Sequence, residues 1–288
     1  MFELANQALA LHTPSATVYL RQGQFLGYST LAIGSAIALM LYPHTATAVL
    51  SAKSANTVRR NAAMLPAYSF LLGLIALLGY IALAAGVVTK NPNEAVPLLF
   101  LKMFPEWFAG FCLAAVAIGA LVPAAIMSIA ASNLFTRNLY GALVRRRMLP
   151  EEESRMAKVV SLVVKFGALL FVLKLPAPYA IEMQLLGGIW MAQLFPSVVV
   201  GVFTRWFNPW ALLIGWAAGM FSGTAMAVSL GLKSSVYPLH VGGDTYAMYA
   251  AVPALILNLT VSVVLTVVFR IVKMGAGTDV TDAAAYVG

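Results

Sequence analysis

The sequence has little charge and almost no cysteine. Asp, Glu, Lys and Arg make up 10% of its 288 residues, whereas hydrophobic residues make up 61%. Soluble domains have about 25% charged and roughly 45–50% apolar residues. The mean hydropathy of +0.87 therefore indicates an integral membrane protein. Cys112 is the sole cysteine, which excludes disulfide frameworks and cysteine-based zinc or iron–sulfur sites within one chain.

Sequence signatures of enzymes are also missing. The chain contains no HExxH, GxxxxGK[ST] or GxSxG motif, and the glycine pairs at 187–188 and 242–243 lack the strand and helix that a phosphate loop needs. The last apolar stretch has no lysine for a retinal Schiff base, and no acidic residue falls at the middle of any apolar stretch. These absences argue against an enzyme, a rhodopsin and a carboxylate proton relay.

The chain does contain long apolar stretches, which we place near 24–50, 65–88, 107–131, 158–176, 180–203, 209–230 and 249–272. Each can cross the membrane as a helix of about 20 residues. Their composition, without period-2 alternation, favours helices over a β-barrel. We predict an all-α membrane protein with an extracytoplasmic segment (1–23), a transmembrane domain (24–272) and a cytoplasmic tail (273–288). The loop at 89–106 reads as a short interfacial helix or a packed outer loop.

The basic residues predict the orientation. Twelve of the eighteen fall on one set of alternating loops, chiefly 51–64 and 133–158, and five fall on the other set. The positive-inside rule then puts the N-terminus outside and the C-terminus in the cytoplasm, with no nucleic-acid partner implied. Residues 1–23 contain no apolar region of a signal peptide. Either a segment upstream is missing or the short tail is translocated unaided.

The first apolar stretch is interrupted by Tyr42, Pro43 and His44. Proline cannot donate a backbone hydrogen bond and disfavours helical geometry at the residue before it. An unwound helix at membrane depth is tolerated where it lines a cavity or a site. The tyrosine hydroxyl and the imidazole suit a small carboxylate or another polar ligand. A simple proline kink, with His44 bonded to a neighbouring helix, is the alternative.

The third stretch is rich in Ala, Gly and Ser, as expected of a central helix. Ala125, Ser128 and Ser132 share one face of it. A backbone carbonyl and two hydroxyls are oxygen ligands that an alkali cation accepts. Serines in helices also bond back to carbonyls one turn earlier, which is the structural alternative.

Lys165 is the basic residue deepest within a predicted span. An ionisable group at that depth is a functional candidate. Its side chain could equally reach cytoplasmic water along the helix, because Lys158 at the helix end is about two turns away. Gln184 and Gln193 in the fifth stretch are polar enough to face a cavity, but the phase of that helix is not fixed by its sequence.

A family resemblance begins at the helix break. The sodium/solute symporter family has a broken sixth core helix and a seventh helix that resemble LYPHTATAVLSAKSANTVRRNAAMLPAYSFLLGLIALLGYIALAAG. Its eighth helix resembles AAIMSIAASNLFTRNLY, and its tenth and eleventh resemble QLLGGIWMAQLFPSVVVGVFTRWFNPWALLIGWAAG. The YPH, KFGALLF and TRWFNPWALL segments are most similar to the bacterial monocarboxylate permease branch. The likeness covers about residues 20–272.

The resemblance implies a LeuT-like core of two inverted five-helix repeats followed by extra helices. This chain matches the second repeat and two later helices. The first repeat, which supplies half of both the substrate site and the usual sodium site, would be missing. The resemblance therefore implies the C-terminal part of a longer transporter, with the first repeat as its partner and the substrate site at Tyr42, Pro43 and His44.

The resemblance also places family sodium ligands on the Ala125 carbonyl and the Ser128 hydroxyl. Many sodium-coupled members have a second hydroxyl directly after the first, where this chain has Ile129. Proton coupling through His44 therefore stays open, since histidine changes charge near neutral pH. Ser132 is positioned to compensate from the next turn.

Two hypotheses follow. The first is a secondary active transporter that carries a small monocarboxylate such as lactate, pyruvate or acetate across the bacterial inner membrane, with Na⁺ or H⁺ as coupling ion and no other cofactor. The second is a membrane fragment or sensor-like module that does not transport.

Overall fold

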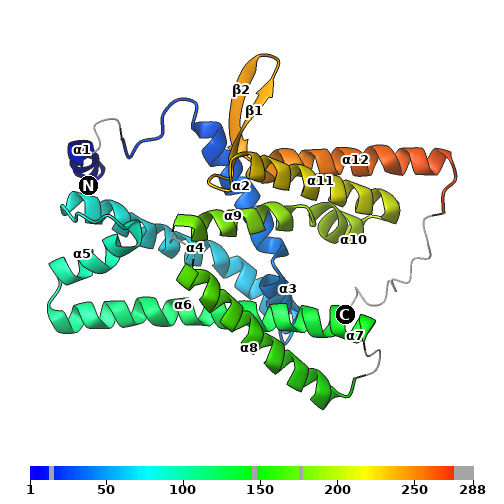
Figure 1. Cartoon of the computed structure of the whole chain (residues 1–288), viewed down its shortest axis with the longest axis horizontal. Coiled ribbons are helices and arrows are strands. Elements are labelled where there is room, and N and C mark those ends of the chain that lie inside the picture. Colours follow the sequence, from blue (N-terminus) through cyan, green and yellow to red (C-terminus); the bar gives the residue numbers. More distant parts are fainter. Residues whose placement is uncertain (13–15, 145–147, 175–177, 276–288) are drawn as a thin grey trace. The chain divides into compact units, whose positions relative to one another are not determined.

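The computed structural model describes residues 1–12, 16–144, 148–174 and 178–275. The chain divides into two compact units. One comprises Met1–Arg21 and Pro43–Ala177, and the other comprises Gln22–Tyr42 and Pro178–Gly288. Helices dominate both units (Figure 1). One of the points at which the chain passes between the units is Tyr42 to Pro43, where the sequence predicts a helix break.

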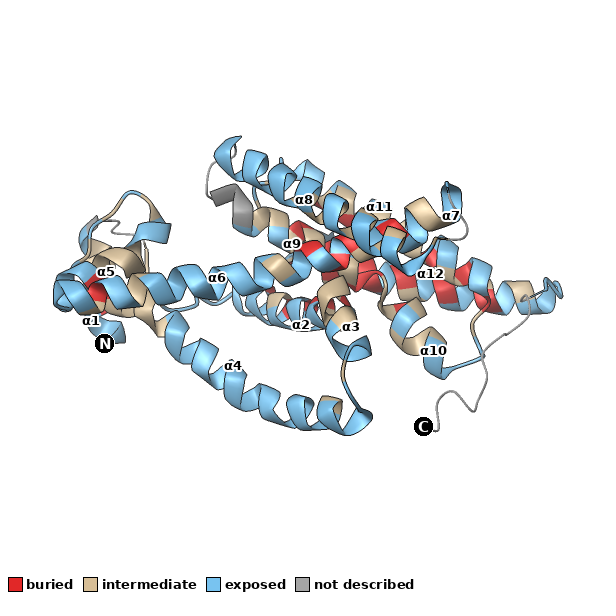
Figure 2. Ribbon diagram, turned by 90° about the horizontal axis from the view of Figure 1, so that it is seen from below, coloured by how far each residue is buried: buried red, intermediate tan, exposed pale blue. Residues whose placement is uncertain are grey.

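The described part of the first unit is built from helices. Helix α6 contacts α3, α5 and α8, and helix α4 contacts α1 and α5. The elements of this unit are α1 (Phe2–His12), α3 (Pro43–Leu50), α4 (Ala55–Ala84), the 3₁₀ turn η1 (Pro92–Glu94), α5 (Ala95–Met103), α6 (Glu106–Leu134), the π-helix η2 (Phe135–Tyr140), α7 (Gly141–Leu143) and α8 (Pro150–Lys174). Figure 2 shows that α4, α6 and α8 are largely exposed. Their apolar surfaces are suited to lipid or to further helices.

The second unit holds the buried core. Its elements are α2 (Phe25–Leu41), α9 (Pro178–Ala192), the π-helix η3 (Pro196–Val200), α10 (Gly201–Phe203), α11 (Pro209–Ser229), β1 (Val236–Val241), β2 (Asp244–Tyr249) and α12 (Ala251–Ile271). Buried residues concentrate on α9, α11 and α12 (Figure 2). Helix α9 contacts α2, α11 and α12.

The spans confirm an all-α membrane architecture. Six helices of the described chain are long and apolar enough to cross a membrane, and α2 with α3 forms a seventh if the broken pair counts as one span. Two helices begin earlier than the apolar stretches that predicted them. Helix α4 begins at Ala55 instead of 65, because the Ser54 side chain accepts a hydrogen bond from the Thr57 N–H. Helix α8 begins at Pro150 instead of 158, with three glutamates in its first turn.

Hydropathy predicts which part of a helix can lie in the membrane, whereas capping residues and prolines determine the residue at which the helix begins. The predicted short helix within 89–106 is present as α5, although its interfacial position stays a prediction. The N-terminal segment 1–23, to which no helix was assigned, contains α1. Most of the predicted tail, 276–288, lies outside the described residues.

A β-hairpin joins α11 to α12 and is absent from the sequence-based prediction. Strands β1 and β2 pair antiparallel, with Val236 opposite Tyr249 and Val241 opposite Asp244. Gly242 and Gly243 form the turn with φ of +61° and +93°, which suits a two-residue hairpin turn of type I′. A Gly-Gly pair between two short alternating runs was the available signal.

A stripe of small residues fixes the packing of α11. Its buried members recur every fourth residue: Ala211, Gly215, Gly219, Gly223 and Ala227. Spacing of this kind lets two helix backbones approach closely within a membrane, and α11 makes its most extensive contact with α12.

A polar network lies within this core. Asn258 of α12 donates from Nδ2 to the Gln193 carbonyl (2.8 Å) and to Gln193 Oε1 (3.3 Å), and Ser262 Oγ donates to Asn258 Oδ1 (3.3 Å). All three side chains are fully buried. Gln193, which the sequence left as a possible cavity residue, is therefore part of the helix packing.

Candidate functional site

The predicted helix break is present at Tyr42 and Pro43. The α2 helix ends at Leu41, Tyr42 adopts an extended backbone with ψ of 138°, and α3 resumes at Pro43. The Tyr42 N–H still bonds the Ala38 carbonyl at 3.1 Å, but Pro43 has no N–H with which to continue the ladder. The break follows from proline chemistry, whereas the ligand-binding role of Tyr42, Pro43 and His44 stays a prediction.

The residues on either side of the break belong to different units. Tyr42 lies in the second unit, where its hydroxyl donates to the Gln184 carbonyl of α9 at 3.3 Å. Gly187 lies beside that hydroxyl, and a Cβ at this position would be at an ordinary contact distance of 3.5 Å from it. Pro43 and His44 lie on α3, which packs against α6 in the first unit. His44 is half-buried.

The predicted cation residues lie together on α6. Ser128 Oγ donates to the Ala125 carbonyl at 2.9 Å, and Ser132 Oγ donates to the Ile129 carbonyl at 2.8 Å. Both serines are buried. Both are hydrogen bonds to carbonyls one turn earlier in the same helix, which is the structural alternative to cation binding. A cation at this position would have to compete with the hydrogen bonds.

The structure adds a third hydroxyl that the sequence did not indicate. Ser161 of α8 donates from Oγ to Ser128 Oγ at 3.2 Å. The two serines are 33 positions apart, and only the packing of α6 on α8 brings them together. Three serine hydroxyls and the Ala125 carbonyl thus come from two packed helices of one unit. Throughout the described ranges, no group of three or more His, Cys, Asp or Glu side chains is arranged to hold a metal.

Thr136 extends the polar stripe of α6 into the π-helix η2. It lies four residues after Ser132 and is fully buried. Within the part of the chain that the structure describes, its Oγ1 is the one buried side-chain polar atom without a hydrogen-bond partner. Such groups are rare and often belong to sites, and π-helical turns are frequent at functional positions. Thr136 thus places a further buried hydroxyl four residues after Ser132.

Thr136→Val is expected to raise the thermal stability of the purified protein in sodium-free buffer. The change removes a buried hydroxyl that has no partner, and such groups cost about 1–3 kcal/mol. Thr266→Val is the matched control, since Thr266 is equally buried but its Oγ1 accepts the Asn208 N–H at 3.2 Å. Thr266→Val should lower the unfolding temperature. Equal losses in both variants would show that Thr136 has a partner.

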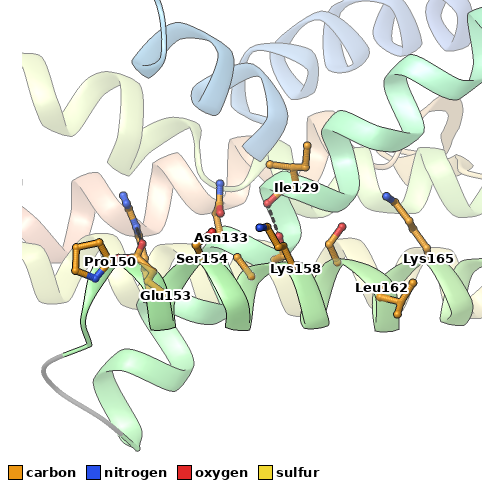
Figure 3. A pocket seen from close by; sticks show the side chains of 12 residues that line it. Ile129, Asn133, Pro150, Glu153, Ser154, Lys158, Leu162 and Lys165 are labelled. Carbon is orange, nitrogen blue, oxygen red and sulfur yellow. Dashed lines mark hydrogen bonds and ion pairs between the residues drawn. The ribbon is translucent and has the colours of Figure 1, made fainter.

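A cleft of about 570 Å³ opens between α6 and α8 (Figure 3). Four of its residues recur along one face of α8, at i, i+4, i+7 and i+11: Ser154, Lys158, Ser161 and Lys165. The opposite wall is supplied by α6 and η2, and it includes Ile129, Ser132, Asn133 and Arg137. The cleft therefore shares Ser132 and Ser161 with the candidate cation site.

The cleft is electropositive. Arg137 forms an ion pair with Glu153, which is the single acidic residue among those that line it. Two positive charges remain, those of Lys158 and Lys165, about 10 Å apart along the helix axis. Figure 3 shows both side chains extending from α8 toward α6. The structure thus places Lys165 on the cleft wall and gives it a setting that can bind a small anion.

A sequence profile of the sodium:solute symporter family matches residues 3–223. A monocarboxylate transport permease protein of Rhizobium johnstonii is 47% identical over 253 residues, which cover 87% of this chain and 51% of the relative. The uncharacterized symporter YodF of Bacillus subtilis is 36% identical over 193 residues, with 67% of this chain and 39% of the relative covered.

A second Bacillus subtilis protein, the uncharacterized symporter YhjB, is 25% identical over 252 residues, covering 86% of this chain and 51% of the relative. The chain spans about half the length or less of the curated relatives it matches. No solved structure gave a significant match.

Proposed function

Because the chain belongs to the sodium:solute symporter family, we propose that it forms part of a cation-coupled symporter for a small monocarboxylate. Lactate, pyruvate and acetate are the substrates we expect, carried across a bacterial inner membrane by alternating access. The symporter family and the relative named as a permease indicate a transporter and not an enzyme. The printed name of the Rhizobium johnstonii relative supports the substrate class.

The observation that carries the proposal is the cleft between α6 and α8. It brings the Lys165 ammonium and the hydroxyls of Ser132 and Ser161 to one space, and Ser161 bonds Ser128 in turn. A carboxylate binds an ammonium through charge-assisted hydrogen bonds, while the hydroxyl cluster supplies oxygen ligands for a coupling cation. Anion and cation would then bind at neighbouring places on two packed helices, which suits symport.

The break at Tyr42 supplies the second part of the proposed path. Broken helices in transporters of this kind place polar backbone and side-chain groups at the substrate. We assign the substrate site to Tyr42, Pro43 and His44, and the Lys165 cleft to a second carboxylate position on the proposed path. The coupling cation is assigned to Ala125, Ser128 and Ser132, with Thr136 as a further ligand. We also propose that transport requires a first repeat of the kind that the other half of the Rhizobium johnstonii relative would supply.

His44→Ala and Ser128→Ala are each expected to reduce uptake of radiolabelled lactate at least about tenfold, a change of about 1.4 kcal/mol. The assay uses cells that express the chain together with the N-terminal half of the Rhizobium johnstonii relative, and cells that express the chain alone show whether the first repeat is required. Ser229→Ala is the matched control, because this exposed serine also bonds a carbonyl three residues earlier, at 2.8 Å, yet lies outside the site.

Replacement of sodium by choline, and collapse of the proton gradient, then separate the two possible couplings. Uptake that needs sodium supports the hydroxyl cluster as the cation site, whereas uptake that needs only the proton gradient assigns coupling to His44. Unaltered uptake in both variants would overturn the site assignment. Absence of monocarboxylate uptake in the co-expressing cells would favour a module that does not transport.

A further inference from the structure

Tyr249, at the junction of β2 and α12, joins two helices of the second unit. Its side chain is fully buried. Its backbone N–H donates to Thr30 Oγ1 of α2 at 2.9 Å, and its hydroxyl donates to the Leu185 carbonyl of α9 at 2.5 Å. The hydroxyl carries its proton at neutral pH, because the unperturbed pKa of tyrosine is about 10 and burial raises the pKa of Tyr249 further.

Glycines on both helices make the space that this ring occupies. A Cβ at Gly34 of α2 would lie 2.5 Å from the ring, and a Cβ at Gly188 of α9 would lie 2.5 Å from the hydroxyl. Real side chains do not come so close, so any larger residue at either position would displace Tyr249. The second glycine of the 187–188 pair therefore has a packing role.

The base of the hairpin is fastened to α9 as well. Ser235 Oγ, next to the start of β1, donates to Glu182 Oε2 at 2.9 Å, and the Ala250 N–H donates to the Ser235 carbonyl at 2.9 Å. The hairpin thus contacts α2 through β2 and holds α9 through Ser235. It forms a strap across the two helices.

The hairpin and the helix break at Tyr42 bind neighbouring residues of α9. The Tyr42 hydroxyl bonds the Gln184 carbonyl and the Tyr249 hydroxyl bonds the next carbonyl, that of Leu185. Two tyrosine hydroxyls from different elements therefore bind consecutive carbonyls of α9, beside Gly187 and Gly188. Tyr42 terminates α2, so whatever holds α2 against α9 also sets the position of Tyr42.

We propose that Tyr249 is a positioning residue that latches α2 to α9 and thereby holds Tyr42 in place for the substrate. The functional part rests on the proposed function, which assigns Tyr42 to the substrate site. Alternating access requires the helices around a site to separate and rejoin. The latch sets how readily α2 leaves α9, and its release exposes surfaces that the closed arrangement buries.

The test uses a cysteine that reports this separation. Ala38 of α2 is 2% exposed and lies against Gly188 of α9. Ala38→Cys, in a Cys112→Ala background, gives a thiol that reacts with N-ethylmaleimide only when the helices part. Tyr249→Phe removes the hydroxyl and keeps the ring. Loss of one buried hydrogen bond is expected to raise the labelling rate about tenfold.

Two pairs of variants serve as controls for the labelling rate, one of tyrosines and one of glycines. Tyr246→Phe alters an exposed tyrosine of the same strand and should leave the rate unchanged. Gly188→Ala should raise the rate as Tyr249→Phe does, whereas Gly187→Ala should not, because its methyl group would be at an ordinary 3.5 Å from the Tyr42 hydroxyl. Equal labelling in Tyr249→Phe and Tyr246→Phe would overturn the latch.

Lactate uptake, measured in the same expression system as above, tests the functional part. Tyr249→Phe is expected to raise the apparent KM for lactate several-fold, and an unchanged KM with faster labelling would overturn the link to Tyr42. The labelling does not depend on transport. Absence of uptake in cells that co-express the unmutated chain and the N-terminal half would count against the proposed function, while faster labelling in Tyr249→Phe would still support the latch.

Discussion

Replacement of Gly215 by alanine is expected to lower the stability of the second unit by about 1–3 kcal/mol, the usual cost of overpacking. A Cβ at this position would collide with Ser262 Oγ and would lie 2.7 Å from the Asn258 backbone carbonyl. The serine can rotate away, but a carbonyl within α12 cannot. Helices α11 and α12 would have to move apart, and the buried network of Asn258 and Gln193 would be disturbed with them.

The effect is measured as the apparent midpoint of thermal unfolding in detergent, followed by size-exclusion chromatography. Gly73→Ala is the matched control, because Gly73 lies within helix α4 and, apart from the adjacent helix backbone, no atom of the described residues lies within 4 Å of its ideal Cβ. Alanine is the better helix former there by roughly 0.5–1 kcal/mol, so this midpoint should stay the same or rise. A midpoint for Gly215→Ala that matches the control would show that α11 and α12 pack less closely.

Lys165→Met is expected to weaken the binding of lactate about 10- to 150-fold. The change keeps an unbranched side chain and removes the charge, and hydrogen bonds to charged groups contribute about 1.5–3 kcal/mol. The loss should appear as a rise in the apparent KM for uptake. Lys165→Arg, which retains the charge, should recover much of the affinity.

Lys174→Met is the control for this change, because Lys174 ends the same helix, is exposed and does not line the cleft. Its KM should match that of the unmutated chain. Equal effects of Lys165→Met and Lys174→Met would mean that the cleft does not bind the carboxylate, and Lys165 would then serve only to reach water at the membrane surface.

Local chemistry explains which features could be foreseen. The break at Tyr42 depends on a proline within an apolar run, and proline acts on its immediate neighbours whatever surrounds it. The back-bonding of Ser128 and Ser132 is also local, since each hydroxyl reaches a carbonyl three residues earlier. The hairpin at Gly242 and Gly243 was foreseeable too, because a Gly-Gly pair between two short alternating runs is a local signal.

Features that depend on distant contacts could not be derived in this way. Lys165 had two interpretations until the packing of α6 on α8 placed it on the wall of a cleft. Gln193 could have faced a cavity until its bonds with Asn258, 65 positions away, assigned it to the core. Tyr249 gave no signal at all, because its partners Thr30 and Leu185 are 219 and 64 positions away.

By itself the sequence determined that this is a multi-pass helical membrane protein of the symporter family with a broken helix at Tyr42. Hydropathy and proline geometry act over one helix at a time, so no tertiary information was needed. The tertiary structure alone decided which polar residues line one cleft and which only hold helices together. It also decided which glycines leave space for the Tyr249 side chain. Those outcomes depend on the rotation of each helix against its neighbours, and packing between distant segments sets that rotation.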